Sequence, residues 1–247
     1  MERHDQPPLA TFFSETELGE GRSVNLADDA AHHARVKRLA VGDIIALTNG
    51  LGARARASIS ALRRNALECW VEQVDVQPPP PPLHLRAPIA DRDRMLWLAE
   101  KATELGITTW QCVRFRRSMS VSPRGEGTAF GGKVRLRMIA ALEQSGAVWL
   151  PAVLPDVDLD ELAPVDASAA FVLDSAGTPL LGVVGEALRA EPTILIGPEG
   201  GIEASEMSRL EASGWRRARL ASATLRFETA GVAAIAVIRA AQLLKQD

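Results

Sequence analysis

Apolar and polar residues alternate along much of the first third of the chain, a period of two that is typical of half-buried strands. Strands are predicted at 43–48, 53–62 and 67–74. A short helix that ends at Gly42 precedes them, and turn residues separate one strand from the next. The pattern predicts a small antiparallel sheet or barrel, with Trp70 inside it.

Further along the chain, apolar strands alternate with segments of helical period. Strands are predicted at 83–89, 108–115, 169–174 and 193–197. Helices are predicted at 92–106, 133–146, 178–190, 204–214 and 229–244. Strand–helix alternation of this kind indicates an α/β domain, in which helices cover both faces of a mostly parallel sheet.

Five consecutive prolines, Pro78–Pro82, separate these two patterns. A proline run favours a stiff polyproline II segment, here roughly 15 Å long at about 3.1 Å per residue. We therefore expect a first domain at 1–77, a linker at 78–83 and a second domain at 84–247.

Composition limits the kind of protein. Hydrophobic residues make up 47% and charged residues 24% of 247, as in soluble globular proteins. We expect no leader peptide after Met1, no membrane span and, with only Cys69 and Cys112 and no ligand spacing, no metal site. Few cysteines also suit a reducing cytoplasm.

Charge is distributed unevenly. The chain has a net charge of −3, yet residues 84–140 hold 11 Lys and Arg against 5 Asp and Glu. A basic segment in an acidic protein suggests an anionic partner at one face. The alternative is a solvated surface that is rich in arginine.

The segment TILIGPEGGIEASE, 193–206, joins a predicted strand to a helix through a glycine-rich turn. Such turns often hold phosphate at the helix N-terminus, but Glu199, Glu203 and Glu206 would repel an anion here. A site at this turn should therefore take a neutral or cationic ligand, with the glycines allowing close backbone approach. The alternative is a turn with helix-capping acids and no ligand.

Two other segments resemble ligand loops. GTAFGGKV, 127–134, lacks the hydroxyl residue of a phosphate-binding loop because position 134 is Val, and we expect a flexible loop there. Downstream, a small-residue loop at 220–224 enters a helix that is apolar on all sides, so this helix should be buried in the domain or against another subunit. Arg226 and Glu228 at its entrance should pair or face a site.

Several short motifs occur together in one order: HHARVKRLAVGD (32–43), ELG (104–106), RS (117–118), EQS (143–145), GPEGG (197–201) and LASATLRFETA (220–230). Their order and spacing resemble the bacterial 16S ribosomal RNA uridine-N3 methyltransferases of the SPOUT class. The resemblance runs from about residue 10 to 244. It implies a PUA-like, RNA-binding barrel followed by a trefoil-knotted SPOUT domain. It also implies a homodimer that binds S-adenosylmethionine (SAM) in the knot.

The resemblance also implies site residues. The implied SAM contacts are Leu173, Ile196, Gly197, Pro198, Glu199, Gly200, Gly201, Ile202, Leu220, Ala221, Thr224, Leu225 and Arg226. The predicted RNA contacts are Arg38, Arg114, Arg116, Arg117, Ser118, Arg124, Lys133, Arg135 and Arg137. The chain departs from the family pattern at Ala147, Trp149, Ala221 and Ala223, where the family usually has arginine or glycine.

Uridine N3 becomes a nucleophile only when its proton leaves, so the site needs a group that stabilises the anion or accepts the proton. Arg226 is the candidate for the first role and Glu228 for the second. Two alternatives remain open: a SPOUT methyltransferase for another RNA atom, such as a tRNA ribose 2′-hydroxyl, and a non-catalytic RNA-binding protein.

Overall fold

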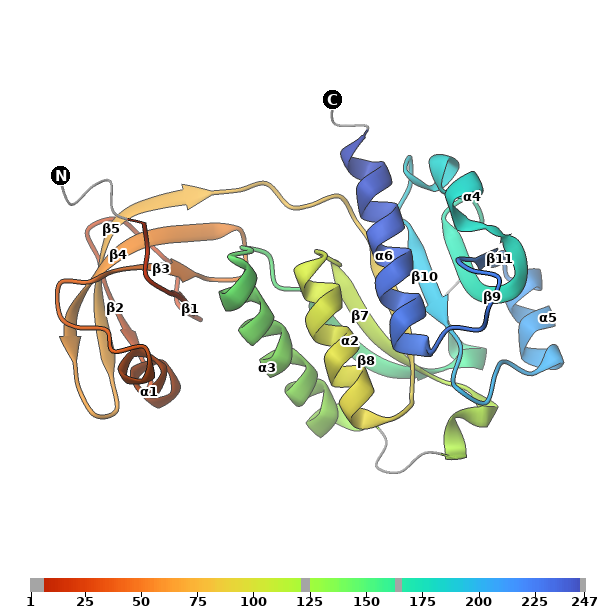
Figure 1. The fold of residues 1–247 in the computed structure, drawn as a ribbon, viewed down its shortest axis with the longest axis horizontal. Helices are drawn as coiled ribbons and strands as arrows, with labels where there is room; N and C mark the ends of the chain where they lie inside the picture. The colour runs from red at the N-terminus through yellow and green to blue at the C-terminus, as the bar shows by residue number, and fades with distance from the viewer. Residues whose placement is uncertain (1–6, 121–124, 163–165, 245–247) are drawn as a thin grey trace. The chain divides into compact units, whose positions relative to one another are not determined.

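The computed structural model describes residues 7–120, 125–162 and 166–244. The chain folds into two compact units, shown in Figure 1. The first comprises Met1–Pro79 and Ile139–Leu150, and the second comprises Pro80–Met138 and Pro151–Asp247. The division between Pro79 and Pro80 falls inside the proline run.

The first unit contains a five-stranded sheet in the order β1-β3-β4-β5-β2 and a short helix, α1 (Asp28–Val36). The strands are β1 (Thr11–Phe13), β2 (Ser23–Leu26), β3 (Ile44–Thr48), β4 (Ala53–Leu62) and β5 (Leu67–Val76). The three predicted strands are confirmed, and β1 and β2 are additional. The predicted helix lies too far along the chain, because α1 ends at Val36 rather than at Gly42.

The prediction that Trp70 is buried is wrong. On β5 the inward positions are Leu67, Cys69 and Val71, all fully buried in one apolar cluster with residues of β3 and β4. Because successive side chains of a strand point to opposite faces, Trp70 is on the outer face, and it is 46% exposed.

The second unit is built on a six-stranded sheet in the order β11-β9-β10-β6-β7-β8, in which every neighbouring pair is parallel. Its strands are β6 (His84–Pro88), β7 (Thr109–Arg114), β8 (Ala152–Asp158), β9 (Ala170–Pro179), β10 (Thr193–Ile196) and β11 (Arg216–Arg219). Its helices are α2 (Arg92–Glu104), α4 (Leu180–Ala187), α5 (Ala204–Ala212) and α6 (Phe227–Leu243). Helix α3 (Gly127–Ser145) begins in this unit, and its residues from Ile139 onward belong to the first unit. A parallel sheet with helical crossovers, preceded by a small β domain, confirms the predicted α/β fold class.

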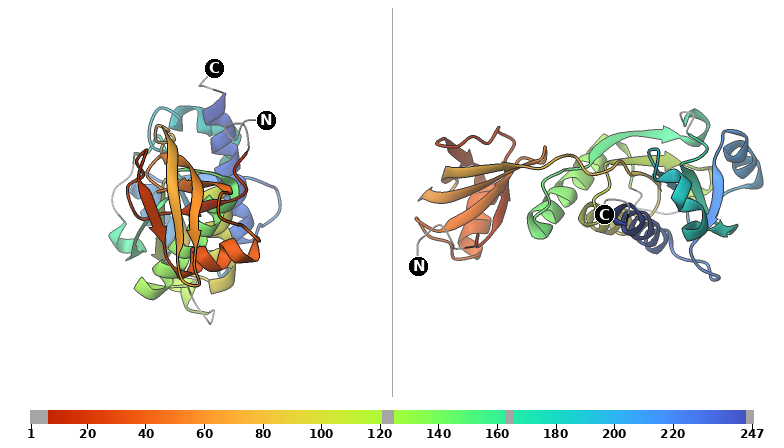
Figure 2. Two further views of the ribbon diagram at one scale, coloured as in Figure 1. Left: turned by 90° about the vertical axis from the view of Figure 1, so that its left-hand side faces the viewer. Right: turned by 90° about the horizontal axis from the view of Figure 1, so that it is seen from above.

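Helices cover both faces of this sheet, as the views in Figure 2 show. On one face α6 packs so closely that a Cβ at Gly231 would lie 2.8 Å from Ile196 of β10 and 2.8 Å from Leu98 of α2. On the other face Met207 and Leu210 of α5 pack with Val172 and Leu195. Strand β10 therefore lies between two helical layers, and the turn that follows it is held from both sides.

The segment 127–132, expected to be a loop, is helical. Helix α3 begins at Gly127, whose N–H donates to the carboxylate of Asp156 (2.6 Å). Phe130, Val134 and Met138 recur every four residues and are buried, which is the pattern of a helix face. Strands β8 and β11 were not predicted, because their half-exposed sequences lack a continuous apolar run.

Candidate functional site

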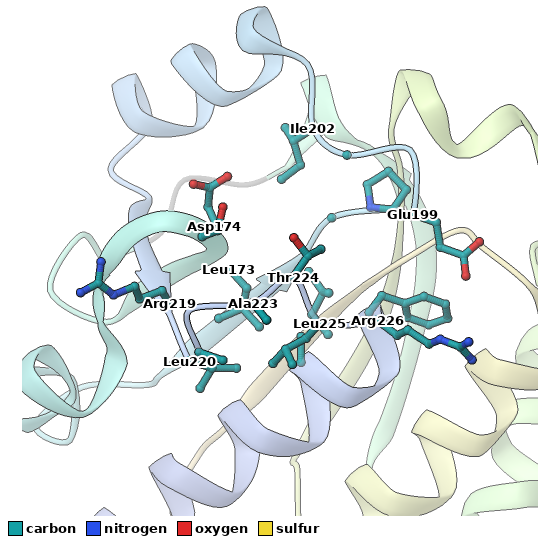
Figure 3. Close-up of a pocket in the computed structure, with 18 of the residues that line it drawn as sticks. Leu173, Asp174, Glu199, Ile202, Arg219, Leu220, Ala223, Thr224, Leu225 and Arg226 are labelled. Atoms are coloured by element: carbon teal, nitrogen blue, oxygen red, sulfur yellow. The ribbon is translucent and has the colours of Figure 1, made fainter.

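A cavity of about 450 Å³ opens beside the end of β10 in the second unit. Three stretches of chain form it: a part of β9, the turn after β10, and the connection from β11 into α6. Its lining comprises Leu173–Ser175, Ile196–Glu199, Gly201–Ile202, Ala218–Ala221, Ala223–Phe227 and Ala230, most of which Figure 3 draws.

An irregularity in β9 shapes one side of the cavity. Val172 is paired with Arg217 of β11, but the next pair joins Thr178 to Ala218, so residues 173–177 bulge out of the ladder with β11. Leu173 keeps its pairing with Ile196 of β10 on the other side. Gly177 permits this path, since a Cβ there would lie 2.5 Å from the backbone nitrogen of Ala218. The bulge directs Leu173, Asp174 and Ser175 to the cavity.

The glycines of the turn after β10 serve packing within the chain. A Cβ at Gly197 would lie 2.7 Å from Cγ1 of Ile202, and one at Gly200 would lie 3.0 Å from Cβ of Arg117. Gly201 adopts a φ of +75°, and its N–H donates to the carbonyl of Pro198 (2.8 Å) to close the turn. Glycine is thus required here by the turn itself, in addition to any ligand.

The three acids of this segment have different roles from those predicted. Glu206 is buried, and its carboxylate accepts hydrogen bonds from the N–H groups of Glu203 and Arg116 (both 2.9 Å). Glu206 and Glu203 form a capping box at the start of α5. Neither Glu203 nor Glu206 lines the cavity, so of these three acids only Glu199 presents its carboxylate there. Arg94 forms an ion pair with Glu199. The expectation of three carboxylates around one ligand is wrong, because two of them cap the helix.

Arg226 and Glu228 lie at the entrance of α6 but are separated by their environments. Arg226 is the N-cap residue of α6; it is exposed and lines the cavity. Figure 3 shows its guanidinium directed away from Thr224. Glu228 is buried, does not line the cavity, and its Oε2 has no hydrogen-bond partner in the described part of the chain. No ion pair joins these two described residues. Of the two predicted outcomes, pairing or facing a site, the structure shows the second for Arg226.

The structure brings together nearly all the residues that the resemblance implied for SAM. All of them line this cavity except Gly200, which packs against Arg117. The same cavity is also lined by residues that the sequence did not predict: Asp174, Ser175, Ala218, Arg219, Phe227 and Ala230. The signal for Asp174 and Ser175 was their position directly after the apolar run 170–173.

Many residues of the predicted RNA-contact segment have acidic partners. Arg114 pairs with Glu126 (2.6 Å) and Asp158 (3.0 Å), and the hydrogen bond to Glu126 is the main cause of its raised pKa. Arg116 and Arg117 both approach Glu203, at 3.5 Å and 3.6 Å. These contacts reduce the free positive charge that the sequence suggested.

The remaining predicted RNA contacts differ in accessibility. Ser118 is buried and its hydroxyl accepts from the N–H of Phe115 (3.1 Å), so it is not available at the surface. Arg137 pairs with Glu100 (3.3 Å), and Arg135 is partly exposed. Lys133 and Arg38 are exposed, and Arg124 lies outside the described residues.

Among the described residues, no group of three or more His, Cys, Asp or Glu side chains is placed to hold a metal ion. None of the helices in the described ranges is long and apolar enough to span a bilayer.

A parallel α/β sheet with a loop-lined cavity at the end of a strand is the arrangement of a ligand-binding α/β domain. The comparison with known families identifies the class. The RNA methyltransferase domain matches residues 77–239, and the RNA methyltransferase PUA domain matches residues 26–71. Since the first match alone covers more than half of the chain, this protein belongs to the RNA methyltransferase family. The predicted family is confirmed.

Its relatives carry a more specific name. Ribosomal RNA small subunit methyltransferase E of Mycobacterium bovis is 26% identical over 223 residues, covering 85% of this chain and 83% of the relative. The enzyme of the same name from Rickettsia conorii is 25% identical, covering 92% and 94%. The crystal structure of ribosomal RNA small subunit methyltransferase E from Neisseria gonorrhoeae bound to S-adenosyl methionine superposes with a TM-score of 0.82 at 26% identity, covering 94% and 97%.

Proposed function

We propose that this protein transfers a methyl group from SAM to N3 of a uridine in 16S ribosomal RNA. The support for small-subunit ribosomal RNA as the substrate is the name shared by its relatives, at about a quarter sequence identity. The choice of uridine N3 rests on the motif resemblance described above. The support for the donor is the SAM-bound relative of the same fold, together with the position of the cavity.

The cavity is the observation that carries the proposal. Its volume of about 450 Å³ lies within the usual range for small-molecule sites, roughly 300–1,000 Å³. Leu173, Ile196, Leu220 and Leu225 supply apolar surface for an adenine ring, and the turn at 197–202 supplies backbone groups for its polar edge. These residues would hold SAM, which when bound supplies the electrophilic methyl group.

Within this proposal the chain must position the uracil and help its N3 proton to leave. A cation near the base lowers the energy of the anion that forms as the proton departs. Arg226 is an exposed cation that lines the cavity at the entrance of α6, and it takes this role by a change of rotamer toward the cavity. Glu228 is not retained as the base, since it is buried and away from the lining.

Replacement of Arg226 by Ala tests this role. We expect the single-turnover methylation rate at saturating SAM and RNA to fall by about 10²–10³, the usual effect of losing one contact to a developing anion. The dissociation constant for SAM, measured by calorimetry on the folded variant, should change by only a few-fold. A rate within a few-fold of the parent would contradict the role.

Contact with RNA is proposed on each unit separately. In the first unit, Arg35 of α1 donates to the carbonyls of Arg63 and Arg64 in the β4–β5 turn. The two segments carry five exposed cations, of which Arg63 pairs with Glu68 (3.1 Å): Arg35, Lys37, Arg38, Arg63 and Arg64. In the second unit Lys133 of α3 is exposed and, within the described residues, has no acidic partner. Such surfaces suit RNA phosphates.

We also propose a homodimer in the cytoplasm, where ribosomal RNA is found. On α6 the side chains of Val232, Ala233, Ala236 and Val237 are only partly buried, which leaves an apolar stripe for a second copy. Light scattering at low micromolar concentration should give twice the mass of one chain. A monomeric mass would contradict this part of the proposal.

Mapping the modified nucleotide distinguishes the proposal from a SPOUT enzyme for another RNA atom. Ribosomal and transfer RNA from a strain lacking the protein, compared with the complemented strain, should differ by one 3-methyluridine in 16S RNA. A missing ribose methyl group in tRNA would favour the alternative target. Unchanged RNA together with measurable RNA binding would favour a non-catalytic protein.

A further inference from the structure

Four ionisable side chains line the cavity, and they are not equally free to meet a ligand. They are Asp174, Glu199, Arg219 and Arg226. Glu199 is engaged by Arg94, and Figure 3 shows its carboxylate directed away from Thr224, on the opposite side of the cavity from Asp174. Of the two carboxylates, therefore, only Asp174 has no arginine bound to it in the described part of the chain.

The bulge of β9 holds Asp174 in place. Its Oδ1 accepts from the N–H of Ala176 (2.8 Å), which fixes the side chain at the wall of the cavity and leaves Oδ2 available. The residue is partly buried, so a charge at this position is screened less than one at the open surface. The bulge of β9 thus presents one oxygen of the fixed Asp174 carboxylate to the cavity that Leu173 and Ile202 also line.

The nearest basic residue does not neutralise this carboxylate. Arg217 makes its ion pair with Glu211 (Nε to Oε1, 2.7 Å), and that contact is the main cause of its raised pKa, with Asp174 contributing least. Within the described residues, no Lys, Arg or His nitrogen lies within 4 Å of the Asp174 carboxylate. A half-buried acid without a cation at a ligand cavity favours a ligand that carries the cation itself.

We propose that Asp174 is the residue of this cavity that recognises the positive charge of the methyl donor. The inference rests on the proposed function, because SAM is cationic at two centres, its sulfonium and its ammonium group. It replaces the acidic turn as the source of charge recognition, since Glu203 and Glu206 cap α5 and Glu199 is paired with Arg94. Asp174 acts here as a binding residue and moves no proton.

Substitution of Asp174 by Asn isolates the charge. Asn keeps the Oδ1 acceptor for the Ala176 N–H, so the turn is preserved while the negative charge is lost. Calorimetric titration with SAM should show binding weaker by roughly 10- to 100-fold, as for loss of one charged hydrogen bond. Asp174→Ser, which also keeps an oxygen acceptor, should show a similar loss.

S-adenosylhomocysteine, which has the ammonium but no sulfonium, identifies the centre that is recognised. An equal loss of affinity for both compounds assigns Asp174 to the ammonium, and a loss for SAM alone assigns it to the sulfonium. Either result supports the proposal.

Glu211→Gln is the matched control. It removes one negative charge, which is paired with Arg217, and Glu211 does not line the cavity, so SAM affinity should stay within about two-fold. Affinity within two-fold of the parent in folded Asp174→Asn would overturn the inference and leave the proposed function intact. A parent protein that does not bind SAM would instead overturn the proposed function as well. A similar loss in Glu211→Gln would show a general field effect and also overturn the assignment to Asp174.

Discussion

Substituting Ala for Gly197 tests why the turn after β10 needs glycine. Gly197 does not have a positive φ, so alanine can adopt its backbone conformation without strain. The effect should come from crowding alone: the new methyl group would lie 2.7 Å from Cγ1 and 3.0 Å from Cδ1 of Ile202. Because Ile202 also lines the cavity, its displacement should reach the SAM site.

The size of the effect follows from this geometry. Carbon atoms in contact prefer a separation of about 3.5–4.0 Å, so Ile202 must move by about 1 Å. Overpacking of one methyl group typically lowers the free energy of unfolding by about 1–3 kcal/mol. For a protein of this length each kcal/mol lowers the midpoint of thermal unfolding by roughly 2–4 °C. We expect SAM affinity to fall in the same variant.

A double-mutant cycle with Ile202→Ala separates crowding from other causes. Truncating Ile202 removes both carbons that would contact the new methyl group, so the double variant should lose less stability than the two single variants together. We expect a coupling free energy of about 1 kcal/mol or more, measured by urea unfolding and by SAM titration. Gly182→Ala on α4 is the control, because a Cβ there meets nothing within 4 Å and should raise stability by about 0.5–1 kcal/mol.

Additive effects of Gly197→Ala and Ile202→Ala, within about 0.5 kcal/mol, would refute the reasoning. A Gly197→Ala variant with unchanged stability and lower SAM affinity would refute it too. That result would mean that the glycine serves only approach of the ligand and that contact with Ile202 is unimportant.

Three further predictions concern other parts of the chain. Arg239→Met should lower the free energy of unfolding by roughly 3 kcal/mol, because the half-buried guanidinium donates to the carbonyls of Leu105 (3.2 Å), Gly106 and Pro81 (2.7 Å). A loss below about 1 kcal/mol in urea titration contradicts this. Burial raises the pKa of Glu143, whose carboxylate accepts from the N–H of Phe13 (2.8 Å). Its contribution to stability is therefore present below about pH 4.5 and is lost as the pH rises through the folded-state pKa, so urea titrations from pH 4.5 to 7.5 should show a decline in the parent that Glu143→Gln lacks. Lys133→Ala should reduce the slope of log K against log salt for RNA binding by about 0.7–0.9, and an unchanged slope means that Lys133 contacts no phosphate.

Local pattern was sufficient for the architecture. The period-two segments became β4 and β5, and strand–helix alternation after the proline run correctly predicted the parallel sheet. Both are decided by which face of each element is apolar, and that information is contained in neighbouring residues. Strands without an apolar run were not predicted, because only local pattern was used. Strand β11 has the sequence RRAR, and its conformation is stabilised by pairing with β9.

The roles of the polar side chains were decided by tertiary structure. Glu199, Glu203 and Glu206 occur within eight residues, yet one lines the cavity and two cap α5, because the capping box uses the backbone N–H groups that the start of a helix leaves free. Trp149, at a position where the family usually has arginine, donates from Nε1 to the carbonyl of Gln77 (3.2 Å). Asp174 becomes a cavity residue only through the register shift of β9 against β11. Such assignments depend on partners far away in sequence, and only the folded chain brings those partners together.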